Sequence, residues 1–263
     1  PWGEAFTLDE LAAALEHHKP AILAMVHAET STGVCQPMDG VGDLCRQHDC
    51  LLLLDTVTSL GGVPLYLDEW KVDMAYSCSQ KGLSCPPGLG PFTMGTRAEA
   101  KLAARKDKVP NWYLDVSLLN QYWGSDRVYH HTAPVNMNFG MREALRLLAE
   151  EGLENAWSRH RRNAEALWNG LQSLGLEMHV PEELRLPTLS TVKIPDDVDG
   201  KAFSSHLLNT HGIEVGGGLG VLAGKIWRIG LMGYNSTPEN VDRLLNLFES
   251  ELPRFREGSC VAA

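Results

Sequence analysis

The feature that most constrains the fold is a pair of short, almost wholly apolar runs. Residues 21–27 read AILAMVH, and residues 51–57 read LLLLDTV. Runs of this length and composition are typical of parallel strands that are buried on both faces. Residues 8–17 and 39–47 are amphipathic and predict one helix before the first run and one between the two. The strand–helix–strand order predicts an α/β fold with helices on both faces of a parallel sheet.

Later segments extend this pattern. The further strands are predicted at residues 72–78, 89–94, 176–180, 189–194, 213–216 and 225–229, and the further helices at residues 97–105, 200–210 and 237–252. Thr237 fits the N-cap position of the last helix. Residues 122–132 are polar and aromatic and predict a loop.

A long helical segment divides the chain. Residues 135–175 predict a nearly continuous helix with a break near Gly152, and a helix of this length commonly links two domains. We therefore expect residues 1–152 to form part of a large domain and residues 153–263 to form a smaller α+β domain. The chain begins with Pro1, in what reads as a loop, so we expect the large domain to be incomplete at its amino terminus.

Composition excludes several classes of function. The chain has 33 acidic against 23 basic residues and a net charge of −10, so we expect no nucleic-acid partner, because phosphates would repel it. The longest apolar run falls far short of the roughly 20 residues of a membrane helix, and no signal peptide is visible. The six cysteines form no CxxC pair, which is typical of reduced, intracellular thiols.

Lys81 is the first candidate for catalysis. The segment Ser77–Gly82 (SCSQKG) follows a predicted buried strand, and ligands bind outside the carboxyl ends of strands in open α/β sheets. A lysine there forms a Schiff base with a carbonyl group if burial or a nearby positive charge lowers the pKa of its amine. The alternative is an ordinary surface lysine.

Asp55 strengthens the first interpretation. It follows four leucines, so its carboxylate stands at the end of a central strand, where burial costs free energy unless a partner offsets it. A protonated pyridine nitrogen would be such a partner. A helix cap and a metal ligand are the alternatives. No His, Asp or Glu stands nearby at metal-ligand spacing, which disfavours the metal.

Two weaker motifs would suggest other kinds of site, one for a dinucleotide and one for a metal ion. Residues 218–223 fit the dinucleotide pattern GxGxxA, but they precede a predicted strand and not a helix, so we reject that interpretation. His130 and His131 are adjacent, and their side chains should diverge. We therefore expect no metal ion.

Six segments carry a more specific pattern: HAETSTGV (27–34), LLLLDTVTSLGG (51–62), SCSQKGLSCPPG (77–88), YHHTAP (129–134), GLENAW (152–157) and GKIWRIGLMG (224–233). In this order they resemble the alanine–glyoxylate (serine–pyruvate) aminotransferases, fold-type I pyridoxal-phosphate enzymes of the class V group. The similarity covers residues 1–253 and is greatest to the animal peroxisomal enzyme. It implies an aspartate-aminotransferase-like large domain, pyridoxal 5'-phosphate as cofactor and a homodimer. It also implies a peroxisomal location, with the mitochondrion and the cytoplasm as alternatives.

The resemblance also implies roles for single residues. Lys81 would be the Schiff-base lysine, and Gln80 would contact the cofactor phosphate. Asp55 would pair with the pyridine nitrogen, and Thr30 would contact the oxygen on the ring.

Three further roles concern the dimer and the substrate. Tyr129 and Thr132 would reach across the dimer interface to the phosphate of the partner's cofactor. Arg228 would bind the substrate carboxylate as a bidentate pair. Residues 123–129 form a shorter loop than in the family, which weakens the assignment of the two interface residues.

Part of the family's cofactor site is not in this sequence. The glycine-rich phosphate turn and the aromatic residue that stacks on the ring would precede Pro1. We therefore expect these 263 residues alone to bind pyridoxal phosphate weakly and to turn over poorly.

The implied reaction is transamination from alanine or serine to glyoxylate or pyruvate, as in glyoxylate detoxification. One alternative is a cysteine desulfurase-like lyase. Those relatives carry His before the lysine and Cys on a mobile loop, whereas Gln80 precedes Lys81 and the smaller domain has no Cys before Cys260. A truncated, non-catalytic homologue is the other alternative.

Overall fold

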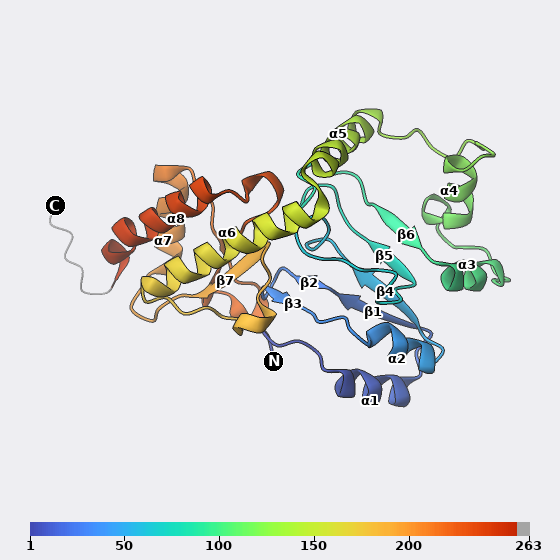
Figure 1. Ribbon diagram of the computed structural model, residues 1–263, viewed down its shortest axis with the longest axis horizontal. Coiled ribbons are helices and arrows are strands. Elements are labelled where there is room, and N and C mark those ends of the chain that lie inside the picture. Colours follow the sequence, from blue (N-terminus) through green and yellow to red (C-terminus); the bar gives the residue numbers. More distant parts are fainter. Residues whose placement is uncertain (257–263) are drawn as a thin grey trace.

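Two large hydrophobic clusters organise residues 1–256, the part of the chain that the computed structural model describes (Figure 1). One cluster belongs to the amino-terminal half, and the other to the carboxy-terminal helices and strands. A small third cluster of Ala28, Val63, Leu186 and Leu189 connects the two halves. Cys260 lies outside the described residues.

A four-stranded sheet forms the centre of the amino-terminal half. Its strands are β1 (Ile22–Val26), β4 (Leu51–Asp55), β5 (Met74–Tyr76) and β6 (Phe92–Met94), in the order β1-β4-β5-β6. The first three are parallel, and β6 is antiparallel to β5. The four strands predicted in this half are confirmed, although each is shorter than its predicted range.

Helices α1 (Leu8–His18) and α2 (Val41–Gln47) pack on one face of this sheet. Thr7 and Glu10 form a capping box that starts α1. The contact is made by apolar side chains from both helices and three strands: Leu11, Leu15, Met25, Val41, Cys45, Leu52, Leu54 and Ala75. Each strand therefore turns every second side chain toward these helices.

The opposite face of the sheet carries no helix among the described residues, so the prediction of helices on both faces is wrong for this chain. Ile22, Val26, Tyr76 and Phe92 are between 39% and 48% exposed there. Strand register places Val26, Asp55 and Tyr76 side by side in one row across the sheet. The Asp55 side chain therefore lies at the open face and not in the helix-covered core.

Shorter elements surround the sheet. A small hairpin pairs β2 (Ala28–Glu29) with β3 (Val34–Cys35), and α3 (Thr96–Ala103) follows β6. Helix α4 (Val116–Trp123) corrects the predicted start of the loop at residue 122, because its last two residues lie in that range. The Asp115 carboxylate caps α4 by accepting a hydrogen bond from the Ser117 backbone N–H.

Helices α5 (Val135–Glu151) and α6 (Leu153–Ser173) connect the two halves and meet at Gly152. Gly152 has a φ of +84°, a conformation that favours glycine, and the predicted break is confirmed. The division into domains 1–152 and 153–263 stays a prediction. Within residues 1–256, no helix combines the length and apolar character needed to cross a membrane.

The carboxy-terminal half contains a second, antiparallel sheet of β7 (Leu189–Lys193), β9 (Ile226–Gly230) and β8 (Gly216–Gly217). The strand predicted at 213–216 is reduced to β8. Residues 176–180 form no strand and contribute one isolated bridge between Met178 and Val192.

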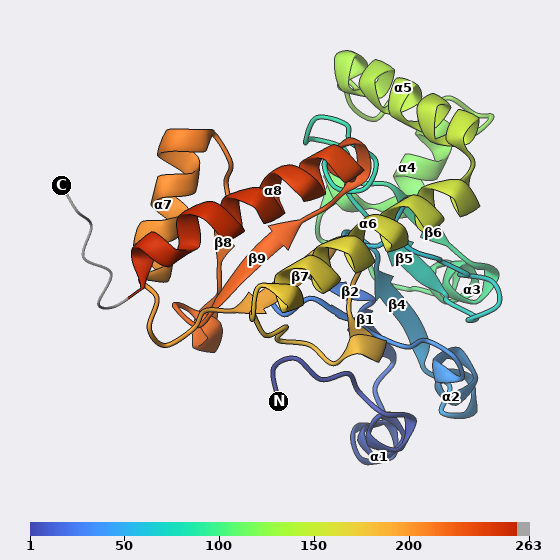
Figure 2. The same ribbon diagram turned by 60° about the vertical axis from the view of Figure 1, so that its left-hand side comes forward.

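Helices α6, α7 (Gly200–His211) and α8 (Pro238–Glu251) pack around this sheet, and Figure 2 shows α6 and α8 running side by side next to β7 and β9. Thr237 caps α8, as predicted, by accepting from the Asn240 N–H at 3.3 Å. Trp227, Phe203 and Phe248 are the largest fully buried side chains of the described chain, and they form edge-to-face pairs.

His27, directly after β1, is buried on the helix-covered side of the sheet. Its ring lies edge-on to Trp70 at 5.1 Å, and its Nε2 lies 3.7 Å from the Cys35 sulfur. Its Nδ1 atom has no hydrogen-bond partner in the described chain. Burial lowers the pKa of His27 from 6.5 to about 4, because no acceptor compensates an imidazolium there.

We expect this histidine to make stability depend on pH. In the unfolded chain His27 takes up a proton near pH 6.5, whereas in the folded chain it does so only near 4, so stability falls as the pH falls through that window. The free energy of unfolding should fall by about 2 kcal/mol less between pH 7 and pH 5 when His27 is replaced with Gln. Urea unfolding at both pH values measures it, and equal losses in both proteins would refute the assignment.

Candidate active site

Asp55 is the last residue of β4, and two donors hold its carboxylate. Oδ1 accepts the Val57 backbone N–H at 2.8 Å, and Oδ2 accepts the Tyr76 hydroxyl at 2.6 Å. The hydrogen bond to Asp55 raises the pKa of Tyr76 to about 12, and burial acts in the same direction. Tyr76 therefore stays protonated near neutral pH, and the carboxylate that it binds is fixed in orientation.

Sequence reasoning missed Tyr76. The residue is 21 positions from Asp55, and only the parallel register of β4 with β5 makes the two opposite neighbours. A signal was present, because Asp55 and Tyr76 each lie two residues before the end of a predicted strand, 51–57 and 72–78. Reading it required the register, which a single sequence does not give.

The loop that carries Lys81 runs beside the segment that follows Asp55. The Ser77 hydroxyl donates to the Thr56 carbonyl at 2.9 Å. A Cβ atom on Gly82 would lie 2.3 Å from the Leu60 carbonyl oxygen, so only glycine allows this close approach. Since β4 and β5 are parallel neighbours, Asp55 and the loop after Tyr76 emerge at the same edge of the sheet.

The Lys81 amine is available for chemistry. The residue is half-buried, and within residues 1–256 its ammonium makes neither an ion pair nor a hydrogen bond. Ser59, on the adjacent segment, has a fully buried hydroxyl that also lacks a partner in the described chain. An uncommitted amine and an unsatisfied hydroxyl near a strand-end carboxylate are compatible with an aldehyde-bearing, protonated pyridine ring.

Arg228 comes from β9 in the other half of the molecule and meets the loop of Thr30. Its Nε donates to the Gly217 carbonyl at 2.7 Å, and its Nη1 donates to the Thr30 carbonyl at 3.2 Å. Nη2 has no hydrogen-bond acceptor among residues 1–256, so part of the guanidinium fork is free for a carboxylate. Two predicted site residues, 198 positions apart, are thus brought together.

Hydroxyl groups of β7 and of the residue just before it fix this contact. Thr191, the register partner of Arg228, donates to the Thr32 carbonyl at 2.7 Å. Thr188 donates to the Thr58 carbonyl at 3.0 Å. Both bonds are buried, so they hold β7 and β9 against the segments beside Asp55 and Thr30.

The other predicted residues lie at the surface. Gln80 is exposed beside Lys81. Tyr129, which is 73% exposed, shares a 3.1 Å hydrogen bond with Thr132, which is also exposed. No hydrogen bond or ring contact within residues 1–256 joins either of these two to Asp55, Lys81 or Arg228.

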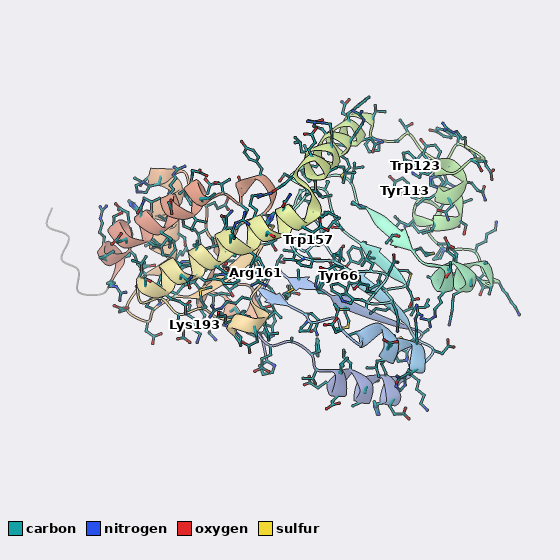
Figure 3. The ribbon with its side chains drawn as sticks, in the orientation of Figure 1. Tyr66, Tyr113, Trp123, Trp157, Arg161 and Lys193 are labelled. Atoms are coloured by element: carbon teal, nitrogen blue, oxygen red, sulfur yellow. The ribbon has the colours of Figure 1, made fainter. Side chains whose placement is uncertain are left out.

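A separate cavity of about 550 Å³ opens near the junction of the two halves and is lined by His27, Tyr66, Trp157, Arg161 and other residues. Figure 3 labels the last three of these four on the side of α6 and the loop after β4. None of Asp55, Lys81 and Arg228 lines this cavity. The candidate site is therefore at the open face and strand ends, not in this cavity.

Known proteins share this architecture. Residues 3–244 match the family model described as aminotransferase class-V. The alanine–glyoxylate aminotransferase of Oryctolagus cuniculus is 47% identical over 254 residues, which are 95% of this chain and 65% of the rabbit protein. The (S)-ureidoglycine–glyoxylate transaminase of Bacillus subtilis is 38% identical over 98% of this chain and 66% of its own length.

A solved structure extends the comparison. The alanine–glyoxylate aminotransferase from Nostoc sp. superimposes with a TM-score of 0.93 at 65% identity, over 95% of this chain and 66% of the Nostoc chain. The chain thus spans about two thirds of the length of these relatives. The predicted aspartate-aminotransferase-like fold class is confirmed. The chain belongs to the aminotransferase class-V family.

Proposed function

We propose that this chain carries the catalytic lysine, the ring-binding aspartate and the substrate arginine of a pyridoxal-phosphate-dependent aminotransferase. The proposed reaction transfers the amino group of alanine or serine to glyoxylate or pyruvate. The observation that carries the proposal is the placement of Asp55 and the Lys81 loop at the carboxyl ends of adjacent parallel strands, with Arg228 held nearby at Thr30. The names of the relatives supply the substrate class.

Bound pyridoxal phosphate would supply an electron sink for a carbanion at the substrate Cα. Asp55 would hold a proton on the ring nitrogen, because its carboxylate is already oriented by Val57 and Tyr76. Lys81 would hold the cofactor, and its amine would take the proton from the substrate Cα.

Arg228 orients the substrate. Its Nε and one Nη1 hydrogen are fixed by backbone carbonyls, so the guanidinium plane is set before a substrate binds. The remaining N–H groups donate to the two oxygens of a substrate carboxylate in a bidentate pair. This contact would hold the substrate by its carboxylate.

The remaining roles rest on the resemblance alone. Thr30 contacts the ring oxygen and Gln80 the phosphate. In a homodimer, Tyr129 and Thr132 reach the cofactor phosphate of the partner subunit. Their exposure, and that of neighbouring Trp112 at 56%, suits residues that a second copy covers. The peroxisomal location stays a prediction that rests on the animal relatives.

Product analysis tests the proposal. The chain, saturated with pyridoxal phosphate, should form pyruvate from alanine only when glyoxylate is present, and glycine should appear in equal amount. Cysteine should release no sulfide. Sulfide release with no pyruvate would favour the lyase chemistry of cysteine desulfurases, and neither product at any cofactor concentration would refute the proposal for this chain.

We expect Arg228→Gln to act on substrate binding. Losing the bidentate contact should raise the KM for alanine about 10²-fold, because a hydrogen bond to a charged group contributes about 1.5–3 kcal/mol. Steady-state kinetics at saturating cofactor measure it. Arg142→Gln, an exposed change on α5, is the matched control. A normal KM in Arg228→Gln would exclude the assigned contact.

Tyr76→Phe should have a moderate effect. It removes one of the two hydrogen bonds that hold the Asp55 carboxylate, so we expect kcat to fall about tenfold, less than when Asp55 itself is changed. Tyr66→Phe is the control, because the Tyr66 ring makes edge contacts with Trp70 and Trp157 instead. An unchanged kcat would show that Tyr76 does not position Asp55.

A further inference from the structure

A cluster of metal-ligand side chains lies in the carboxy-terminal half, apart from the candidate active site. His206 and His211 come from α7 and Glu251 from the end of α8. One ligand atom of each lies within 4.8 Å of the other two. We propose that these three residues form a binding site for a divalent transition metal of the zinc class.

The ligand set suits such an ion. Two imidazoles and one carboxylate are a known zinc-binding combination that leaves one coordination position open. Zinc bonds of about 2.0–2.1 Å in tetrahedral geometry set ligand atoms about 3.3 Å apart. His206 Nε2 and Glu251 Oε2 are already 2.8 Å apart, so His211 has to approach by only about 1.5 Å.

His211 supplies the observation that points to a ligand. Its Nε2 atom is buried and has no hydrogen-bond partner in the described chain, an arrangement that costs free energy. His211 is the last residue of α7, and its ring packs edge-on to that of His206 at 5.3 Å. A metal ion bound between the rings would satisfy this nitrogen.

His206 is oriented for coordination through its other nitrogen. Its Nδ1 lies 3.1 Å from the Thr210 hydroxyl, one helical turn along α7. When Nδ1–H donates to that hydroxyl, the Nε2 lone pair faces the Glu251 carboxylate and is available to a metal ion that the carboxylate also binds.

Arg254 competes with a cation for Glu251, and Arg243 adds positive charge at the end of α7. Arg254 Nη1 binds Glu251 Oε2 at 2.5 Å, but Arg254 is 54% exposed and free to turn toward solvent. Arg243 donates to the His211 carbonyl at 2.8 Å. We therefore infer a site of moderate affinity that links the end of α7 to the end of α8.

Cobalt binding tests the site. The full chain, without an affinity tag and freed of metal by a chelator, is titrated with Co²⁺ and followed by visible absorption. We expect one equivalent to bind with the intense bands of tetrahedral cobalt, and Zn²⁺ to displace it. His211→Ala and Glu251→Gln should each weaken binding at least about tenfold, and Zn²⁺ should raise the Tm of the wild type but not of these two variants.

The control is His17→Ala, which removes an exposed histidine from the last turn of α1 and should bind cobalt as the wild type does. Glu251→Gln keeps the side-chain shape, so the site remains testable if His211→Ala does not fold. The absence of stoichiometric cobalt binding would overturn the proposal. Equal binding by the wild type and Glu251→Gln would also overturn it.

Discussion

Replacing Lys81 with Ala should reduce transamination by a factor of about 10³ or more, the largest effect expected in this chain. The variant loses the amine that holds the cofactor covalently and the base that moves the Cα proton. No other amine is expected to replace it, because the close packing of Gly82 against the Leu60 carbonyl holds the loop in place. Two measurements are needed: kcat with alanine and glyoxylate, and the visible absorption of the lysine-bound cofactor, which should disappear.

The matched control is Lys71→Ala, which removes a lysine that pairs with Asp43 at the surface, away from the strand ends. Its kcat and spectrum should remain those of the wild type. Both variants should retain the circular dichroism of the wild type, since neither lysine belongs to a hydrophobic cluster. Full activity in Lys81→Ala would remove the basis of the proposed function.

Replacing Asp55 with Asn should lower kcat about 10²–10³-fold and weaken cofactor binding. The amide keeps the shape of the side chain but cannot hold a proton on the ring nitrogen as an anion does. It also presents an N–H₂ group where the carboxylate accepts from Val57 or Tyr76. Steady-state kinetics and cofactor titration measure the two effects.

Asp115→Asn is a useful control for Asp55→Asn, because Asp115 also accepts a backbone N–H at a segment end but caps α4 instead. It should lose little activity. If Asp55→Asn retained wild-type kcat while Lys81→Ala did not, a lysine-dependent reaction without a protonated ring would be indicated. The assignment of Asp55 would then be wrong.

Local sequence patterns predicted much of this fold. Leu51–Leu54 are uniformly apolar, so the strand that ends at Asp55 was visible without its neighbours. The break at Gly152 and the cap at Thr237 were equally local, because each depends on one residue type at a helix end. The strand predicted at residues 176–180 was wrong. An apolar stretch predicts a strand, but here only Met178 forms a β-bridge to another segment.

The site was less accessible to sequence reasoning, since its contacts join distant segments. Lys81 was found because it follows a predicted strand, and Asp55 because it follows four leucines near the end of another. The Tyr76 hydrogen bond to Asp55 and the Arg228 contact with Thr30 depend on strand register and on how the two halves pack. The contact between His206 and Glu251 likewise joins side chains on two helices, 45 positions apart in the sequence.

The open face of the four-stranded sheet was also not predicted. An unbroken apolar run such as Ile22–Val26 indicates two covered faces, yet in the described chain Val26 and Tyr76 are exposed. The apolar pattern of a strand indicates that both of its faces are suited to burial. It does not indicate whether the segment that covers each face lies in the same 263 residues.

Mapping where pyridoxal phosphate attaches shows directly whether Lys81 holds it. The chain is saturated with pyridoxal phosphate, reduced with borohydride so that even a weak complex is fixed, and digested for peptide mass spectrometry. We predict one dominant label on Lys81, which decreases strongly in Asp55→Asn. A label spread evenly over surface lysines such as Lys71 and Lys101, with Lys81 unmodified, would exclude Lys81 as the residue that binds the cofactor.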